Sequence, residues 1–248
     1  MKARRLVFLL LFIPALGFAS DTGHHLLKAN IDLHDQYALQ RGAKLFVNYC
    51  ISCHSAAYMR YNRMGRDLGL TDQQVQDNLM FASKKVGGLM TVAMDSKGAA
   101  NWFGVAPPDL SLSSRSRGVD WLYSYLLSFY LDRSPTRPFG VNNLIFKDVA
   151  MPHALWELQG WQQPVYKTGL DKEGHEHKVI EKLELVEPGK LNAAEYKRAV
   201  RDLVTFMAYL GEPGKLERQR IGVWVLVFLA VFFVVALMLK KEYWKDVH

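Results

Sequence analysis

Cysteine is scarce in this sequence. The 248 residues contain two cysteines, Cys50 and Cys53, which stand in the stretch NYCISCHSAAYMRYN together with His54. With one pair of thiols the chain forms at most one disulfide, so a disulfide-rich scaffold is excluded. A zinc finger is excluded as well, because the sequence has no second C-x-x-C pair and no histidine pair at the spacing that such a site needs.

An excess of charge of one sign is absent from the central part of the chain. The whole sequence carries a net charge of +7, from 31 Lys and Arg against 24 Asp and Glu. Three of the basic residues lie within 1–19, and six basic and three acidic residues lie within 215–248. The remaining 22 basic and 21 acidic residues nearly cancel. The basic surplus therefore belongs to the two ends, and we expect no nucleic acid as a partner.

The two ends of the chain have the patterns of membrane-targeting segments. Residues 1–19 combine a basic start, an apolar run too short to span a bilayer and a small-residue cleavage site, which is typical of a secretory signal peptide. Near the C-terminus, residues 221–239 form an uncharged run of 19 residues with no polar face. At a rise of about 1.5 Å per residue, a helix of this length crosses a hydrocarbon core of roughly 30 Å.

The signal peptide decides the orientation of the chain, because the Lys and Arg residues that flank the apolar run are balanced, with three on each side. We therefore predict a signal peptide over 1–19, an exported domain over 20–214, a membrane anchor over 215–240 and a short cytoplasmic tail over 241–248. This organisation is that of a single-pass protein of a bacterial inner (plasma) membrane whose domain lies on the periplasmic side.

Cys50, Cys53 and His54 form a C-x-x-C-H motif, for which several chemistries are open. A disulfide is the simplest use of two thiols in an exported domain. A thioredoxin-like site would follow a strand of a βαβ unit, whereas residues 35–50 have apolar side chains at helical spacing. In covalent haem attachment, two thiols add to the two vinyl groups of a porphyrin and the adjacent histidine lies under the iron. Export and the preceding helix favour this last interpretation.

A haem that only transfers electrons needs a second axial ligand, commonly a methionine. Met151 is our candidate, because it lies about 97 residues after the motif in a segment without a regular period, and Pro152 biases it towards an extended backbone. His153 is the rival ligand in the same segment, and a core role for Met151 stays open. The other methionines lie in the signal peptide or the anchor, too close to the motif, or in or near predicted helices: Met1, Met59, Met64, Met80, Met90, Met94, Met207 and Met238.

Three stretches, in this order and ahead of a single C-terminal anchor, resemble the cytochrome c1 family: RGAKLFVNYCISCHSAAYMRY, APPDLSLSSRSRG and DVAMPHAL. This family supplies the haem subunit of the quinol–cytochrome c oxidoreductase (cytochrome bc1) complex. The resemblance runs from about Asp32 to the C-terminus. Every c-type cytochrome shares the C-x-x-C-H motif, whereas the PPDLS element, the following R-x-R and the anchor make the match specific.

The resemblance implies the ligands of the cofactor. Cys50 and Cys53 would carry the two thioether bonds of one covalent haem c. His54 would be the proximal ligand of the iron, and Met151 would be the distal ligand.

Two further elements match the family. Arg115, the first arginine of RSR, matches the arginine that pairs with a haem propionate, and Pro107 and Pro108 match the loop that packs along the haem edge. A buried propionate needs a cationic partner, and arginine is able to bind it through two hydrogen bonds. The chain lacks a further cysteine pair that some members have, so packing must supply the rigidity of that disulfide. It also lacks long acidic insertions, which argues against strongly electrostatic docking of an electron acceptor.

The expected fold is a mainly α-helical, class I-like c-type cytochrome domain with long loops and a small β-hairpin, followed by one transmembrane helix. We expect a helix over 120–131 and a hairpin within 177–189. A further helix should begin after Asn192, which forms a capping box with Glu195. This helix should pack on the helix before the C-x-x-C-H motif through an apolar stripe of Tyr196, Val200, Leu203, Met207 and Leu210.

The function that the resemblance implies is an electron relay, with enzyme activity belonging to the whole complex. The haem would accept an electron from an iron–sulfur (Rieske) subunit, in a complex with cytochrome b, and pass it to a c-type cytochrome. The alternative is an anchored haem enzyme or sensor with an open sixth position, such as a peroxidase, for which His153 is the candidate acid–base residue. His175 and His177 form a candidate metal pair, for which solvated turn residues are the simpler interpretation.

Overall fold

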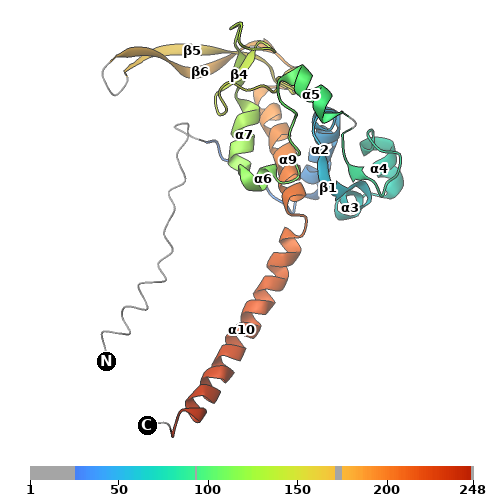
Figure 1. Ribbon diagram of the computed structural model, residues 1–248, viewed down its shortest axis with the longest axis vertical. Helices are drawn as coiled ribbons and strands as arrows, with labels where there is room; N and C mark the ends of the chain where they lie inside the picture. The colour runs from blue at the N-terminus through green and yellow to red at the C-terminus, as the bar shows by residue number, and fades with distance from the viewer. Residues whose placement is uncertain (1–25, 93, 171–174, 247–248) are drawn as a thin grey trace.

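The computed structural model describes residues 26–92, 94–170 and 175–246, so the predicted signal peptide lies outside the described residues. Two helices from opposite ends of the domain, α2 (Gln36–Leu45) and α9 (Ala193–Gly211), pack side by side at its centre (Figure 1). The other elements are η1 (Phe46–Cys50), β1 (Ala56–Arg60), α3 (Tyr61–Asp67), α4 (Asp72–Leu79), β2 (Leu89–Met90), α5 (Ser96–Phe103), α6 (Ser113–Ser116), α7 (Val119–Leu127), β3 (Phe129–Leu131), β4 (Val141–Asn143), α8 (Trp156–Gln159), β5 (Gly160–Leu170), β6 (Glu176–Pro188) and α10 (Lys215–Tyr243).

The contact between α2 and α9 confirms the predicted helix pair. The helix α9 begins with the expected capping box, in which the side chains of Asn192 and Glu195 each accept a hydrogen bond from the other residue's backbone N–H. The five residues of its predicted apolar stripe are all buried. The helices approach closely at Gly42, where a Cβ atom would clash with the backbone carbonyl of Asp202. Phe46 and Phe206 then pack their rings 5.5 Å apart across the same contact.

The predicted helix over 120–131 is wrong in its last turn. The helix α7 ends at Leu127, and residues 129–131 form the strand β3, which pairs in antiparallel register with β4. The side chain of Asn143, on β4, donates a hydrogen bond of 2.8 Å to the carbonyl of Tyr125 near the helix end. In a longer helix, the carbonyl of Tyr125 would accept a hydrogen bond from an N–H of the helix itself. Here it accepts one from Asn143, which lies 18 residues further along the chain. Tertiary pairing therefore ends α7 early.

The predicted hairpin within 177–189 is also wrong in extent. That segment is a single strand, β6, which pairs with the strand β5 over the whole length of β5. The hairpin of β5 and β6 projects sideways from the domain at the end far from α10 (Figure 1). Its base is fixed to the domain by Gln162, whose side-chain amide donates to the carbonyls of Leu127 and Phe129. The hairpin is therefore an arm attached at one end.

The helix α10 leaves the domain alone (Figure 1). None of its 29 residues is buried. Within the described residues it is the one helix long and apolar enough to cross a membrane, with a hydropathy of 3.0 over its most apolar window. The domain that it carries is mainly helical, with long loops and, in the part of the chain that the structure describes, three two-stranded sheets. These features confirm the expected fold class.

Candidate haem site

The C-x-x-C-H motif lies in a tight turn at the end of the first packed helix. The helix α2 continues into η1, a π-helical turn that ends at Cys50. The backbone N–H groups of Cys53 and His54 both donate to the carbonyl of Cys50, at 3.1 and 2.9 Å. A π-helical turn inside a helix is rare and frequently accompanies a functional site. The turn brings the three residues of the motif together on one side of the helix end.

The two cysteines of the motif are free thiols and are half-buried. Burial, with a smaller contribution from Cys53, raises the pKa of Cys50 to about 12. The Cys50 side chain is therefore an uncharged thiol at neutral pH. Two reduced thiols separated by two residues are what thioether formation with a porphyrin requires.

The imidazole of His54 is oriented by the loop that contains Pro108. Its Nδ1 lies 2.7 Å from the carbonyl oxygen of Pro108. Because a carbonyl only accepts hydrogen bonds, Nδ1 carries the proton and Nε2 keeps a lone pair for a metal. Burial lowers the pKa of His54, which keeps the ring neutral. A neutral histidine whose second nitrogen is hydrogen-bonded to a backbone carbonyl is the arrangement typical of a metal ligand.

The loop of Pro108 is itself pinned to the chain that follows the motif. The carboxylate of Asp109 accepts a hydrogen bond of 2.9 Å from the N–H of Ala57, and the hydroxyl of Ser111 accepts one of 3.1 Å from the N–H of Tyr58. From the sequence, Pro108 was expected to pack along the haem edge. The hydrogen bond between its carbonyl and His54, and the contact that Asp109 makes with Ala57, were not expected. The spacing of the PPDLS element gives no signal of which backbone atom faces the histidine.

Met151 lies in the loop between β4 and α8, partly buried against the hydrophobic core. Its sulfur lies 3.3 Å from the hydroxyl of Tyr125, on α7. Tyr125 was not among the residues expected from the sequence. Its spacing of four residues from Trp121 on a predicted helix indicates only that the two side chains share a helix face. The contact holds the thioether of Met151 at a defined place beside α7.

The rival ligands are in the core. The ring of His153 is 4 % exposed, stacks on Phe129 with centroids 5.0 Å apart and meets Trp161 edge-on. This packing ties His153 to the base of the hairpin. Four methionines of the sequence are at most 4 % exposed within the core: Met59, Met64, Met90 and Met207.

The two arginines of the RSR element point to different neighbours, and both are exposed. The side chain of Arg115 packs near Gly211, at the end of α9, and its charge helps to lower the pKa of Glu212. The guanidinium of Arg117 lies over the ring of Trp121, 5.2 Å from its centroid. Arg117 therefore contacts α7, the helix whose Tyr125 forms a hydrogen bond with Met151.

The candidate residues thus form two clusters. Contacts join Cys50, Cys53, His54 and Pro108 in one cluster and join Met151 with Tyr125 in the other, while Cys50 and Met151 pack against the same core. Large apolar side chains are exposed on the segments that lead to Pro108 and Met151, with Trp102 68 %, Val105 57 % and Phe146 44 % exposed.

These residues fit a haem. An imidazole nitrogen and a thioether are the two iron ligands that such a haem needs, and two thiols are its attachment points. The exposed apolar side chains on the segments that lead to Pro108 and Met151 would be covered by a large flat apolar group.

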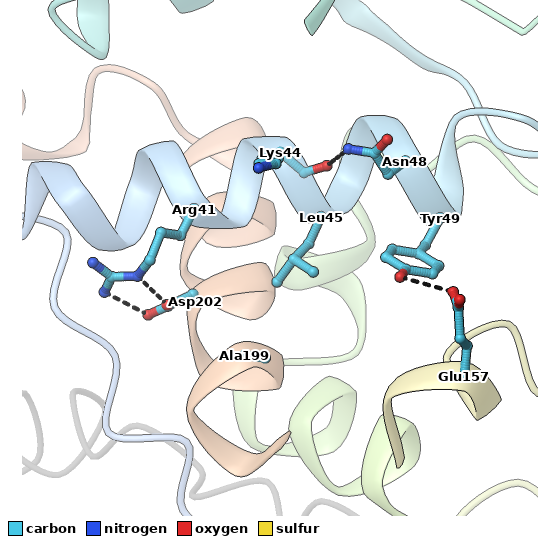
Figure 2. A pocket seen from close by; sticks show the side chains of 8 residues that line it. All are labelled: Arg41, Lys44, Leu45, Asn48, Tyr49, Glu157, Ala199 and Asp202. Carbon is cyan, nitrogen blue, oxygen red and sulfur yellow. Dashed lines mark hydrogen bonds and ion pairs between the residues drawn. The ribbon is translucent and has the colours of Figure 1, made fainter. Parts of the chain in front are cut away.

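A surface hollow between α2, α8 and α9 is unrelated to these donors (Figure 2). Arg41 and Asp202 pair across it at 2.6 Å, and the hydroxyl of Tyr49 donates to Glu157 at 3.3 Å. Figure 2 shows these polar side chains facing one another, with no sulfur or imidazole among the residues that line the hollow. The hollow is a surface groove between helices, and the two polar contacts bridge it.

A helical domain with a C-x-x-C-H turn, followed in the described residues by one helix apolar enough to cross a membrane, has the features of a membrane-anchored c-type cytochrome. Comparison with known proteins narrows the class. The model of the cytochrome C1 family matches residues 27–88 and 89–247. The chain therefore belongs to the cytochrome c1 family, and is a haem-containing electron-transfer cytochrome of the bc1 complex.

Individual relatives match most or all of this chain. The chain is 51 % identical over 248 residues to a cytochrome c1 of Allochromatium vinosum, with all of both chains covered. It is 46 % identical over 248 residues to a protein of Nitrosomonas europaea named ammonia monooxygenase gamma subunit, with 99 % of this chain and 100 % of that protein covered. A cytochrome b/c1 of Bradyrhizobium diazoefficiens is 24 % identical over 249 residues, which cover 86 % of this chain and 34 % of that protein.

Proposed function

We propose that this chain relays single electrons from an iron–sulfur (Rieske) subunit to a c-type cytochrome, within a membrane complex that also contains cytochrome b. The observation that carries the proposal is the His54 imidazole, which the Pro108 carbonyl fixes at 2.7 Å in the tautomer that leaves Nε2 for a metal. Family membership supports the same conclusion. The name cytochrome b/c1, given to a single longer relative, supports cytochrome b as a partner.

The proposed ligands divide the work of holding the cofactor. Cys50 and Cys53 bind one haem c covalently, His54 is the proximal ligand and Met151 the distal ligand. Bound haem supplies a reversible one-electron change between ferric and ferrous iron. To that change the chain would contribute a thioether donor, which raises the potential relative to a second histidine. No bond of a substrate needs to be made or broken on this chain.

The proposed topology follows from the sequence and is supported by α10. Residues 1–19 direct export, residues 20–214 form the periplasmic domain, residues 215–240 cross the bacterial inner membrane and residues 241–248 stay in the cytoplasm. In the structure, Glu212 accepts a hydrogen bond of 2.6 Å from Arg218 at the junction of α9 and α10. This ion pair spans the connection between domain and anchor, and Arg115, the proposed propionate partner, lies on the neighbouring α6.

Covalent attachment is tested by extraction. The protein is purified from a host that matures c-type cytochromes, denatured and treated with acidified organic solvent. Haem should stay on the polypeptide, and with Cys50→Ala and Cys53→Ala combined it should pass into the solvent. Release of haem from the unaltered protein would show that no thioether bonds are present.

The place in a complex is tested by extraction of the membrane in mild detergent. The chain should co-purify with a b-type cytochrome and an iron–sulfur protein, and quinol should reduce its haem. An open sixth position, as in the peroxidase-like alternative, would show as a high-spin spectrum and rapid binding of added cyanide. Co-purification with the subunits of an ammonia monooxygenase, which the name of the second relative suggests, would replace the proposed partners.

A further inference from the structure

A column of stacked side chains ends at the sulfur of Met151. Trp121 and Tyr125 lie one turn apart on α7, and their rings stack with centroids 5.0 Å apart and planes inclined by 9°. Arg117 lies over the ring of Trp121, with 5.2 Å between its Cζ and the ring centroid. Phe129 packs edge-on against the Tyr125 ring at 5.1 Å. The ring of Tyr125 is therefore held by two aromatic neighbours.

The hydroxyl of Tyr125 has an unusual partner. Tyr125 is 9 % exposed, and among the described residues its hydroxyl forms one hydrogen bond, to the Met151 sulfur at 3.3 Å. A thioether is a weak acceptor, and backbone carbonyls bind buried hydroxyls better. Tyr196, a buried tyrosine of α9, shows the ordinary arrangement, because its hydroxyl donates to the carbonyl of Leu126 at 2.9 Å. Stability of the fold alone does not explain why Tyr125 donates to sulfur.

We propose that Tyr125 is a positioning residue for the distal ligand. Its hydroxyl binds one lone pair of the Met151 sulfur and leaves the other lone pair for the iron, which defines where the ligand stands. The hydrogen bond also withdraws electron density from the sulfur. A weaker sulfur donor takes more stabilisation from ferric iron than from ferrous iron, so the hydrogen bond would raise the reduction potential. The inference rests on the proposed role of Met151 as distal ligand.

The test is Tyr125→Phe in the full chain, which keeps the stacked ring and removes only the hydroxyl. We expect the ferric–ferrous equilibrium to move roughly three- to tenfold towards ferric iron, which is about 30–60 mV at 59 mV per tenfold for one electron. The near-infrared band of the methionine–ferric bond should shift but remain. Tyr196→Phe is the matched control, because it deletes a buried hydroxyl bonded to a carbonyl and should leave both band and potential unchanged.

Met151→Leu, measured beside these variants, separates the two ideas. If Met151→Leu keeps the band, Met151 is not the ligand and the proposed ligand set fails. If Met151→Leu loses the band while Tyr125→Phe and Tyr196→Phe both match the unaltered protein, the role of Tyr125 is disproved. Trp121→Leu is the second variant, for the case that Tyr125→Phe yields no haem-loaded protein. It frees one face of the tyrosine ring and should lower the potential in the same direction, and an unchanged potential would equally overturn the inference.

Discussion

The proximal and distal sides of the candidate haem site are held in different ways. On the proximal side, a backbone carbonyl fixes His54, and the loop that carries it is bound to residues 57 and 58 by further hydrogen bonds. On the distal side, the Met151 sulfur meets a single side-chain hydroxyl at 3.3 Å. A carbonyl is a strong acceptor of a hydrogen bond and a thioether a weak one.

The difference indicates which side is rigid and which is adjustable. His54, the proposed proximal ligand, belongs to the same short segment as both cysteines, so the proposed covalent attachment and ligation would support each other. Met151, the proposed distal ligand, belongs to a loop that contacts α7 through one hydroxyl. Substitutions on the proximal side should therefore decide whether haem is held, and those on the distal side should decide its potential.

The largest effect is expected for His54→Leu. This change removes the proposed proximal ligand, and the Pro108 carbonyl loses its 2.7 Å partner. The low-spin spectrum should be lost in both oxidation states, and the yield of haem-loaded protein should fall strongly. Haem staining of a denaturing gel and the visible spectrum measure both results. A low-spin spectrum that persists in His54→Leu would show that His54 is not the proximal ligand.

Met151→Leu is expected to have a large effect on the potential and little effect on haem content. Leucine keeps the apolar packing against the core and removes the sulfur. The methionine–ferric band should vanish and the potential should fall substantially, since a thioether favours ferrous iron. A redox titration and the near-infrared spectrum give the answer. Full retention of both signals would transfer the ligand role to His153 or to another methionine.

Asp109→Ala should weaken the proximal side through its loop. The Asp109 carboxylate accepts hydrogen bonds from the N–H groups of Ala57 and Ser111, at 2.9 and 2.8 Å. We expect the free energy of unfolding to fall by about 1–2 kcal/mol, with covalent haem and the distal band retained. Asp95→Ala, which removes the cap of α5, is a matched loss of a carboxylate that binds backbone N–H.

Urea unfolding of the haem-loaded protein in detergent measures the stability of both variants. Asp109→Ala should also speed the exchange of His54 for added imidazole, whereas Asp95→Ala should not. Equal exchange rates in the two variants would mean that the loop of Pro108 does not hold the proximal ligand.

The smallest effects are expected for the two exposed arginines. An exposed ion pair or cation–π contact contributes less than about 1 kcal/mol, so each substitution to alanine should be mild. Arg117→Ala loosens the Trp121 end of the stacked column and should shift the distal band slightly. Arg115→Ala should lower the potential without moving the band, if Arg115 pairs with a propionate. Identical results for the two would make Arg115 a surface charge.

Features that depend on neighbours in sequence were predictable. The capping box of Asn192 with Glu195 stands at the predicted helix start. The apolar stripe of α9 is buried as the helical period predicts, because burial of one face follows from spacing alone. The strand pairings were not predictable. Residues 129–131 continue the apolar pattern of α7, yet they pair with β4, whose residues Val141–Asn143 give no local signal of that pairing.

The sequence by itself determined the C-x-x-C-H turn, the helix that leads into it, the apolar anchor and the family, because each rests on residue types at short spacing. The tertiary structure decided which groups fix the candidate ligands. Pro108 lies 54 residues from His54, and Tyr125 lies 26 residues from Met151. Contacts over such separations arise when helices and loops pack, and spacing along the chain carries no information about which carbonyl or hydroxyl then lies within hydrogen-bond distance.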